Sequence, residues 1–124
     1  QVPEALEWDG CDAAARHVLA WVDDTPVATG RLLPSGHIGR MAVLAEFRGQ
    51  GVGTAVLRLL LTLARTAGLA QVFLNAQLQA ADFYRAHGFI SDGESFLDAG
   101  IAHVSMRLHL GAATLSPKSN GVVK

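Results

Sequence analysis

Three glycines recur at alternate positions in the segment Arg48-Gly49-Gln50-Gly51-Val52-Gly53, between two largely apolar stretches. Glycine leaves the backbone bare, so neighbouring N–H groups can converge on an anion. If a helix begins at this point, the positive end of its dipole adds to the attraction, and the arginine supplies a cation. The segment therefore predicts a cradle for a pyrophosphate.

The spacing of the glycines narrows the type of phosphate ligand. A nucleotide P-loop needs G-x-x-x-x-G-K-[ST], and this turn has no lysine. A dinucleotide fingerprint needs G-x-G-x-x-G, but Thr54 and Val56 stand where its last glycine would be. The spacing that is present is R-x-x-G-x-G, formed by Arg48, Gly51 and Gly53. A plain connection between a strand and a helix is the weaker alternative.

Two regular elements would position this turn. Residues 37–43 end in apolar and β-branched residues, which is typical of a strand, and residues 54–67 are mostly Val, Leu and Ala, as expected for a helix. Gly68 then suits the left-handed position after a helix. The polar residues of the helix fall on one stripe: Thr54, Arg58, Thr62 and Arg65. So narrow a stripe indicates that protein covers most of the helix.

Length and composition bound the remaining possibilities. The 124 residues make one domain, 50% of them are hydrophobic, and the formal net charge of −1 does not point to nucleic acid. A single cysteine, Cys11, excludes an internal disulfide framework, and the sequence shows neither a signal peptide nor an apolar run long enough to span a membrane. We expect a cytoplasmic protein without nucleic-acid or membrane partners, with a domain at residues 1–110 and a flexible tail at 111–124.

The other expected elements complete an α/β chain. Residues 1–12 are acidic and irregular and are interpreted as a loop. Short turns join the strands expected at 16–22, 27–33 and 37–43, which predicts an antiparallel meander. After the long helix we expect a strand at 71–75, a helix at 80–87 and strands at 89–96 and 102–110. A strand, a helical crossover and another strand imply that 37–43 and 71–75 form a parallel pair.

This order of elements resembles the GNAT superfamily of acyl-CoA N-acyltransferases, whose acyl-CoA signature is R-x-x-G-x-G. A second motif, ADFYRAHGF at residues 81–89, is similar to the family segment A-x-x-F/L-Y-x-x-x-G-F. The segments IGRMAV, LNAQ, FYRAHGF and DAGIAHVSM are similar to the ElaA-like branch. The resemblance covers residues 1–110. It implies an α/β fold with a mixed central sheet, made of an antiparallel meander, a parallel pair and a C-terminal hairpin, with helices packed on it.

Members of this family usually begin with a strand and one or two helices before the meander. That part is missing from this sequence, and we expect it to have been truncated, cleaved or left out. The strand at residues 16–22 would then have an uncovered edge. Such an edge favours pairing with a second copy of the chain, as a homodimer.

The resemblance implies an acetyl-CoA-dependent N-acetyltransferase. The pyrophosphate would be held by the residues of the turn: Arg48, Gly49, Gln50, Gly51, Val52, Gly53 and Thr54. The backbone of Met41, Ala42 and Val43 would pair with the pantetheine amides like an added strand, and the Val43 N–H would be the oxyanion donor. Tyr84 would protonate the departing CoA thiolate; a tyrosine that only packs against the sheet is the alternative.

The acceptor side is less defined. Many relatives carry an asparagine seven residues before the tyrosine, where this chain has Gln77, and Asn75 lies two residues earlier; either amide could meet the pantetheine arm. The general base is not evident, and water could relay the proton instead. The candidates are Glu46, Glu94, His37 and His103. Arg40 either pairs with an acid such as Asp9 or Asp12, the favoured interpretation, or faces an acidic substrate.

We therefore predict transfer of an acetyl group from acetyl-CoA to a primary amine on a small molecule or peptide. Small amines, polyamines, antibiotics, peptide N-termini and lysine all remain open as acceptors. The alternative is a catalytically inactive CoA-binding sensor or partner module. No metal is expected, because no two histidines share a ligand spacing and the cysteine has no thiol partner.

Overall fold

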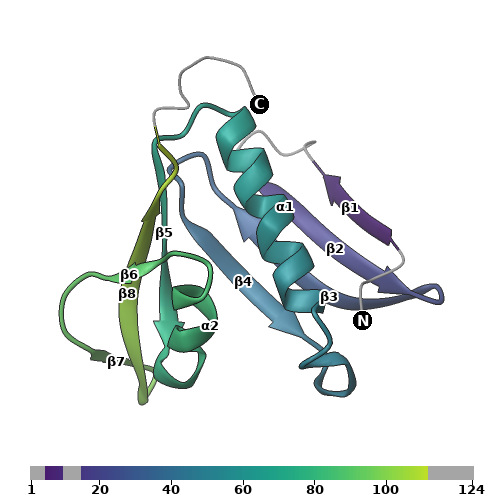
Figure 1. Ribbon diagram of the computed structural model, residues 1–124. Helices are drawn as coiled ribbons and strands as arrows, with labels where there is room; N and C mark the ends of the chain where they lie inside the picture. Colours follow the sequence, from purple (N-terminus) through teal and green to yellow (C-terminus); the bar gives the residue numbers. More distant parts are fainter. Residues whose placement is uncertain (1–4, 10–14, 112–124) are drawn as a thin grey trace. The chain divides into compact units, whose positions relative to one another are not determined.

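The computed structural model describes residues 5–9 and 15–111, which belong to two compact units at residues 1–67 and 68–124 (Figure 1). The first unit is an antiparallel sheet in the order β1-β2-β3-β4, followed by one long helix. Its elements are β1 (Ala5–Asp9), β2 (Arg16–Val22), β3 (Thr25–Leu32), β4 (Ile38–Val43), a short 3₁₀ helix η1 (Ala45–Phe47) and α1 (Val52–Thr66). The expected meander is confirmed.

Strand β1 corrects two expectations. Residues 1–12 were expected to form a loop, and the edge of the strand at 16–22 to be uncovered. Instead β1 pairs with β2 in antiparallel fashion, with Ala5 opposite Trp21 and Asp9 opposite His17. The sequence Leu-Glu-Trp-Asp within β1 alternates apolar and acidic residues, which is the period of a strand. The argument for a homodimer through the β2 edge was therefore wrong.

Helix α1 lies across β2, β3 and β4 (Figure 1). Its apolar face is buried, and the polar residues of the expected stripe are exposed except for half-buried Thr54. The close approach of helix and sheet depends on Gly30. A Cβ atom there would lie 2.8 Å from Leu60 Cδ1, 2.9 Å from Met41 Sδ and 3.0 Å from Val56 Cγ1. Real Cβ atoms do not show contacts this short, so the surrounding side chains would have to shift to admit any residue other than glycine.

A β-bulge interrupts the pairing of β3 with β4. Thr29 pairs with Ala42 and Arg31 with Gly39, so two residues of β4 oppose the single residue between them on β3. One of these two, Arg40, has a φ of +54°. That is the left-handed region, which is uncommon for a residue other than glycine. No feature of the sequence predicted this bulge.

The second unit is a smaller antiparallel sheet in the order β5-β8-β6, with β7 also paired to β8. Its elements are β5 (Gln71–Gln77), a 3₁₀ helix η2 (Leu78–Ala80), α2 (Ala81–Arg85), β6 (Ile90–Ser91), β7 (Phe96–Asp98) and β8 (Ile101–His109). The turn expected around Asp98-Ala99-Gly100 is present as a tight hairpin, with φ values of +54° at Ala99 and +79° at Gly100.

Several boundaries differ from expectation. The long helix begins two residues earlier, at Val52, and the second helix is shorter than residues 80–87. The strand expected at 89–96 is wrong, because residues 92–95 separate β6 from β7 and Gly93 in that gap has a φ of +98°.

Three other expectations concern Gly68, the parallel pair and the tail. Gly68 has the expected left-handed conformation, with a φ of +80°. The expected parallel pair is not confirmed: β4 belongs to the first sheet and β5 to the second. Most of the expected tail, residues 112–124, lies outside the described residues.

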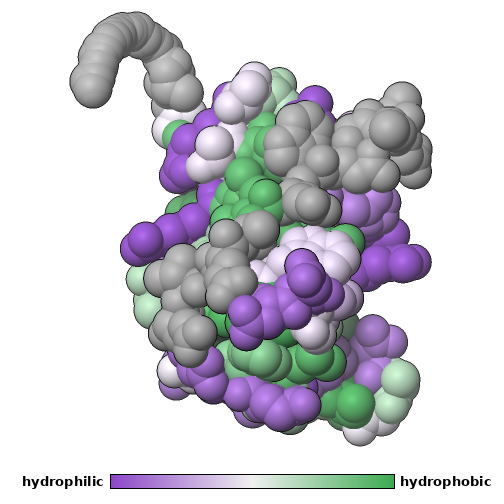
Figure 2. All heavy atoms as spheres, turned by 90° about the vertical axis from the view of Figure 1, so that its right-hand side faces the viewer, coloured by the Kyte–Doolittle hydropathy of each residue, from purple (hydrophilic) through white to green (hydrophobic). Residues whose placement is uncertain are grey.

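The surface of the molecule is mixed in character. Hydrophobic residues reach it in several places, as the green areas of Figure 2 show. Leu6 and Leu19 are 39% and 38% exposed, although most apolar residues of β2, β3 and α1 are buried. Within residues 5–9 and 15–111, no helix has the length and apolar character needed to cross a membrane.

Candidate functional site

The glycine turn joins η1 to α1 and leaves the start of the helix open. Gly49 and Gly51 have φ values of +76° and +85°, which glycine adopts without steric cost. Gly51 is the N-cap of α1, and no side chain caps the helix. The first intrahelical hydrogen bond runs from Ala55 N to Gly51 O at 3.0 Å. The N–H groups of Val52 and Gly53 therefore lie before the first hydrogen bond of the helix and can donate hydrogen bonds to an anion.

The side chains of the turn bind to its own backbone. Arg48 Nε donates to Val43 O at 3.0 Å, and Gln50 Nε2 donates to Glu46 O at 3.0 Å. These bonds hold the turn against the end of β4 and place the guanidinium beside it. A Cβ atom on Gly49 would have no atom within 4 Å, so its outer side is open. The first turn of α1 holds no acidic residue that would repel an anion. Open glycines, a cation and an uncapped helix together fit a pyrophosphate.

The end of β4 presents backbone groups on its outer edge. Leu44 N donates to Val27 O at 2.8 Å, so the N–H of Leu44 points toward β3. Successive residues of a strand point their backbone groups to opposite sides. The N–H of Val43 therefore points away from β3, on the same side as the carbonyl that Arg48 binds. Met41 shares this direction, while Ala42 pairs with Thr29 on β3. The predicted roles of Met41 and Val43 fit this arrangement, whereas Ala42 uses its backbone within the sheet.

In the second unit, Tyr84 lies in α2 and is 8% exposed. Its ring packs edge-on against Phe83 and Phe89, with centroid distances of 5.0 and 5.7 Å. Burial of the phenol disfavours the phenolate and raises the pKa of Tyr84 above its ordinary value. The side chain therefore keeps its proton at neutral pH. It can act as a proton donor, and it is also a packing residue.

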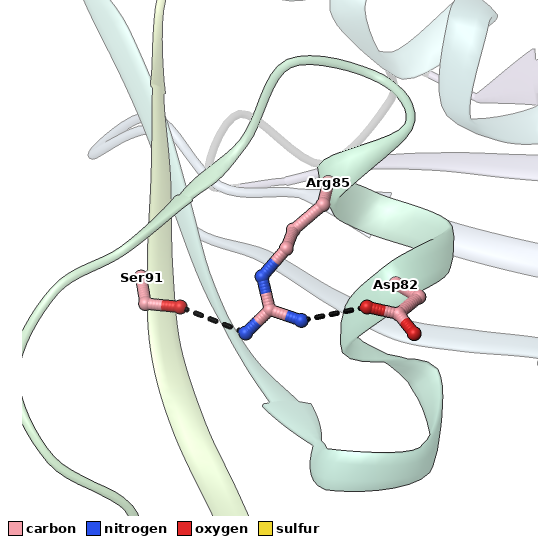
Figure 3. A network of polar contacts seen from close by, with 3 residues as sticks. All are labelled: Asp82, Arg85 and Ser91. Atoms are coloured by element: carbon pink, nitrogen blue, oxygen red, sulfur yellow. Dashed lines mark hydrogen bonds and ion pairs between the residues drawn. The ribbon is translucent and has the colours of Figure 1, made fainter.

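A polar network fixes the short helix that carries Tyr84. Arg85 Nη1 bonds to Asp82 Oδ1 at 2.8 Å, and Arg85 Nη2 donates to Ser91 Oγ at 3.1 Å (Figure 3). The first contact lies within α2, and the second ties α2 to β6. Sequence reasoning missed this link, although the spacing of Asp82 and Arg85 is that of a helical ion pair.

Asn75 and Gln77 lie on one exposed face of β5. Asn75 Oδ1 accepts a hydrogen bond from Ser105 Oγ at 2.9 Å, across the pairing of β5 with β8. Gln77 Oε1 accepts one from Gln79 Nε2 at 2.6 Å. The oxygen of each amide is thus engaged within the chain. Either amide could still offer a pantetheine arm an N–H donor or the second lone pair of its oxygen.

The four candidate bases lie in different surroundings. Glu46 and Glu94 are exposed, and His37 begins the stretch that leads into β4. The ring of His103 stacks on Phe96 at 6.0 Å, and its Nδ1 lies 2.7 Å from Ile101 O. An Nδ1–H group at this position can donate to the carbonyl, and Nε2 would then be the nitrogen that faces other partners. Among residues 5–9 and 15–111, no group of three or more His, Cys, Asp or Glu could hold a metal.

Comparison with known proteins identifies the class of protein to which this fold and glycine turn belong. Residues 2–110 match the acetyltransferase (GNAT) domain, and the chain belongs to this family of acetyltransferases. It is 35% identical over 109 residues to the uncharacterized N-acetyltransferase YjcF of Bacillus subtilis, covering 85% of this chain and 78% of YjcF. It is also 35% identical over 108 residues to protein ElaA of Escherichia coli, covering 82% and 71%.

Solved structures agree with this assignment. The crystal structure of Escherichia coli ElaA matches with a TM-score of 0.70 and 32% identity, over 77% of this chain and 68% of ElaA. An acyl-CoA N-acyltransferase from Pseudomonas aeruginosa matches with a TM-score of 0.69 and 33% identity, over 76% and 68%. A GNAT acetyltransferase from Elizabethkingia anophelis, solved with acetyl-CoA bound, shares the fold at 12% identity, with a TM-score of 0.69 over 85% and 97%. The expected GNAT fold and the similarity to ElaA are confirmed.

Proposed function

We propose that this protein transfers an acetyl group from acetyl-CoA to a primary amine. The observation that carries the proposal is the uncapped start of α1, where Gly49 and Gly51 are both left-handed and Arg48 stands alongside. This arrangement suits a pyrophosphate, which CoA contains. The GNAT structure from Elizabethkingia anophelis was solved with acetyl-CoA bound, which supports the same donor here.

The residues of the first unit would bind and polarise the thioester. The N–H groups of Val52 and Gly53 would hold the pyrophosphate, with Arg48 adding charge. The outward backbone of Met41 would pair with pantetheine. The outward N–H of Val43 would donate to the carbonyl oxygen as negative charge builds on it. Bound in this way, acetyl-CoA supplies the activated acetyl group.

Tyr84 would supply the proton that the leaving thiolate takes. An ordinary thiol has a pKa of about 8.5, so at neutral pH a departing thiolate is stabilised by protonation. The raised pKa of Tyr84 keeps the phenol neutral and able to donate. The base that removes a proton from the acceptor ammonium is either a side chain among the four candidates or water.

Calorimetry with acetyl-CoA tests the cradle. Gly51→Val should abolish binding, because a side chain would enter the space where phosphate meets backbone. Arg48→Ala should weaken binding less, by about 1–3 kcal/mol for a lost charge-assisted contact. Gly68→Val is the matched control, since its φ of +80° imposes similar backbone strain beyond the opposite end of α1. Normal binding by the Gly51 variant would place the cradle elsewhere.

A thiol-release assay over a panel of primary amines tests the transfer itself. Release that depends on the amine, with an acetylated product identified by mass spectrometry, is the expected result. Binding of acetyl-CoA without transfer to any amine would instead favour an inactive CoA-binding module.

A further inference from the structure

The face of the first sheet that points away from α1 carries a row of basic residues. The direction toward α1 is set by Gly30, whose missing side chain would meet Leu60 and Val56 of the helix. Neighbours of Gly30 on β3 therefore point the opposite way. Strand pairing aligns His17, Arg31 and Gly39 as one row on this far face. A second row, formed by Leu19, Thr29 and Ala42, lies beside it.

The β-bulge adds Arg40 to the basic row. Ile38 is buried, and Met41 Sδ lies 2.9 Å from the position of a Cβ on Gly30, so both residues face α1. The two residues between them, Gly39 and Arg40, consequently share the far face. A Cβ on Gly39 would lie 3.7 Å from Arg31 Nη2 and 3.5 Å from His37 Cε1. Arginine and histidine side chains thus gather around one glycine.

No acid in the described part of the chain neutralises the two guanidinium groups. Arg31 Nε is buried without a hydrogen-bond partner, and no ion pair with a described residue is found for exposed Arg40. Asp9 shares the row through its pairing with His17. The side chain of Asp9 and all of Asp12 lie outside the described part of the chain, so the expected pairing of Arg40 with one of these acids stays a prediction.

The conformation of Arg40 also points to a ligand. A φ of +54° is costly for arginine, and such strain is retained mainly where function requires it. The bulge places Arg40 on β4 three residues before Val43, the proposed oxyanion donor. A planar guanidinium binds a carboxylate through two parallel hydrogen bonds. The adjacent row of Leu19, Thr29 and Ala42 carries no charge, and Leu19 is 38% exposed.

We propose that Arg40 and Arg31 bind the carboxylate of the acceptor, which is therefore a primary amine that also carries a carboxylate group. The carbon chain of the acceptor lies over the row of Leu19, Thr29 and Ala42, between the carboxylate and the reacting end of β4. This inference rests on the proposed acetyl transfer, and it names the class of acceptor that the transfer uses.

Matched pairs of amines test the inference. The thiol-release assay compares β-alanine with β-alaninamide and γ-aminobutyrate with its amide, and we expect the carboxylates to be the better acceptors. Arg40→Met should raise KM for the carboxylates about 10- to 100-fold, the worth of a charge-assisted contact. KM for acetyl-CoA and the turnover of the amides should not change. Arg65→Met, at the exposed last turn of α1, is the control and should change none of these values.

A reversed charge gives an independent test. Arg40→Glu should shift the preference from γ-aminobutyrate toward diaminobutane, because the introduced carboxylate attracts a second ammonium group. Equal use of carboxylates and amides by the unaltered protein would overturn the inference while leaving the proposed transfer intact. So would a loss of thermal stability in Arg40→Met without any change in KM. A preference for phosphoethanolamine over β-alanine would overturn the carboxylate assignment, because the two arginines would then recognise a phosphate group on the acceptor.

Failure of the transfer itself gives a different result. If acetyl-CoA binds but no amine is acetylated, the proposed function fails, and calorimetry with γ-aminobutyrate still decides the inference. Binding that Arg40→Met weakens about 10-fold or more supports the carboxylate site, and binding that is absent, or unaffected by the change, contradicts it.

Discussion

The proposed reaction gives Tyr84 a second role beside packing, and the motif around it does not separate the two. Its ring is part of the apolar core of the second unit, between Phe83 and Phe89. Its hydroxyl would be the proton donor of the proposed reaction. A substitution that removes the hydroxyl and keeps the ring can distinguish them.

We predict that Tyr84→Phe lowers kcat by roughly 10²- to 10⁴-fold, the usual contribution of one general acid. Affinity for acetyl-CoA, measured by calorimetry, should stay nearly unchanged because the ring still packs. Both values are measured with an acceptor that the unaltered protein uses. An unchanged kcat would make Tyr84 a packing residue only, and a lost affinity would make it a binding residue.

The raised pKa of Tyr84 also predicts how stability depends on pH. In the unfolded chain the phenol ionises near its ordinary pKa of about 10, while in the folded chain it stays protonated to higher pH. Above pH 10 the unfolded state therefore binds fewer protons, and the free energy of unfolding falls as pH rises through the folded pKa. This contribution is fully present below pH 10.

Denaturant unfolding across alkaline pH should show a shallower loss of stability in Tyr84→Phe than in the unaltered protein. Because Tyr84 is the single tyrosine of the chain, its ionisation can be followed directly by the ultraviolet absorbance of tyrosinate. Parallel pH profiles for the two proteins would show that burial of this phenol has no energetic consequence.

At the scale of elements, the glycine turn depends on α1 lying close to the sheet behind it. That closeness requires Gly30, which leaves room for Leu60 and Val56. The same packing buries the apolar face of the helix and so orients its first turn. Gly30 thus acts on the candidate site only through the packing of α1.

We predict that Gly30→Ala lowers the free energy of unfolding by about 1–3 kcal/mol, because a Cβ at 2.8 Å from Leu60 Cδ1 overpacks the core. Chemical denaturation measures the change. Gly39→Ala is the matched control on the neighbouring strand, where the nearest atom would be 3.5 Å away, and it should change stability by less than about 0.5 kcal/mol. Equal effects of the two substitutions would argue against tight packing at Gly30.

At the scale of the whole molecule, binding and folding are linked. A ligand that binds only the folded protein adds RT ln(1 + [L]/Kd) to its stability. Acetyl-CoA at 100 times its Kd should therefore raise the free energy of unfolding by about 2.7 kcal/mol and increase Tm. Differential scanning calorimetry measures the shift, and Gly51→Val should show none. A Tm that acetyl-CoA leaves unchanged would contradict the proposed cradle.

Local patterns made part of this protein predictable from its sequence. The glycine turn, the helix after it, the left-handed Gly68 and the meander all follow from propensity and spacing among residues that are close in the chain. The family followed from two short motifs for the same reason. Strand β1 was open to prediction as well, since its residues alternate, but the acidic residues around it favoured a loop.

Other features were decided by contacts between residues distant in the sequence. Between the pairs Thr29–Ala42 and Arg31–Gly39, β4 has one residue more than β3, and this extra residue produces the bulge at Arg40. The sequence of one strand does not by itself specify its register with the partner strand. The bond from Ser105 to Asn75 joins residues 30 positions apart. Register and long-range pairing therefore determine which polar groups meet, and they align His17, Arg31 and Gly39 in one row, which their spacing in the sequence does not indicate.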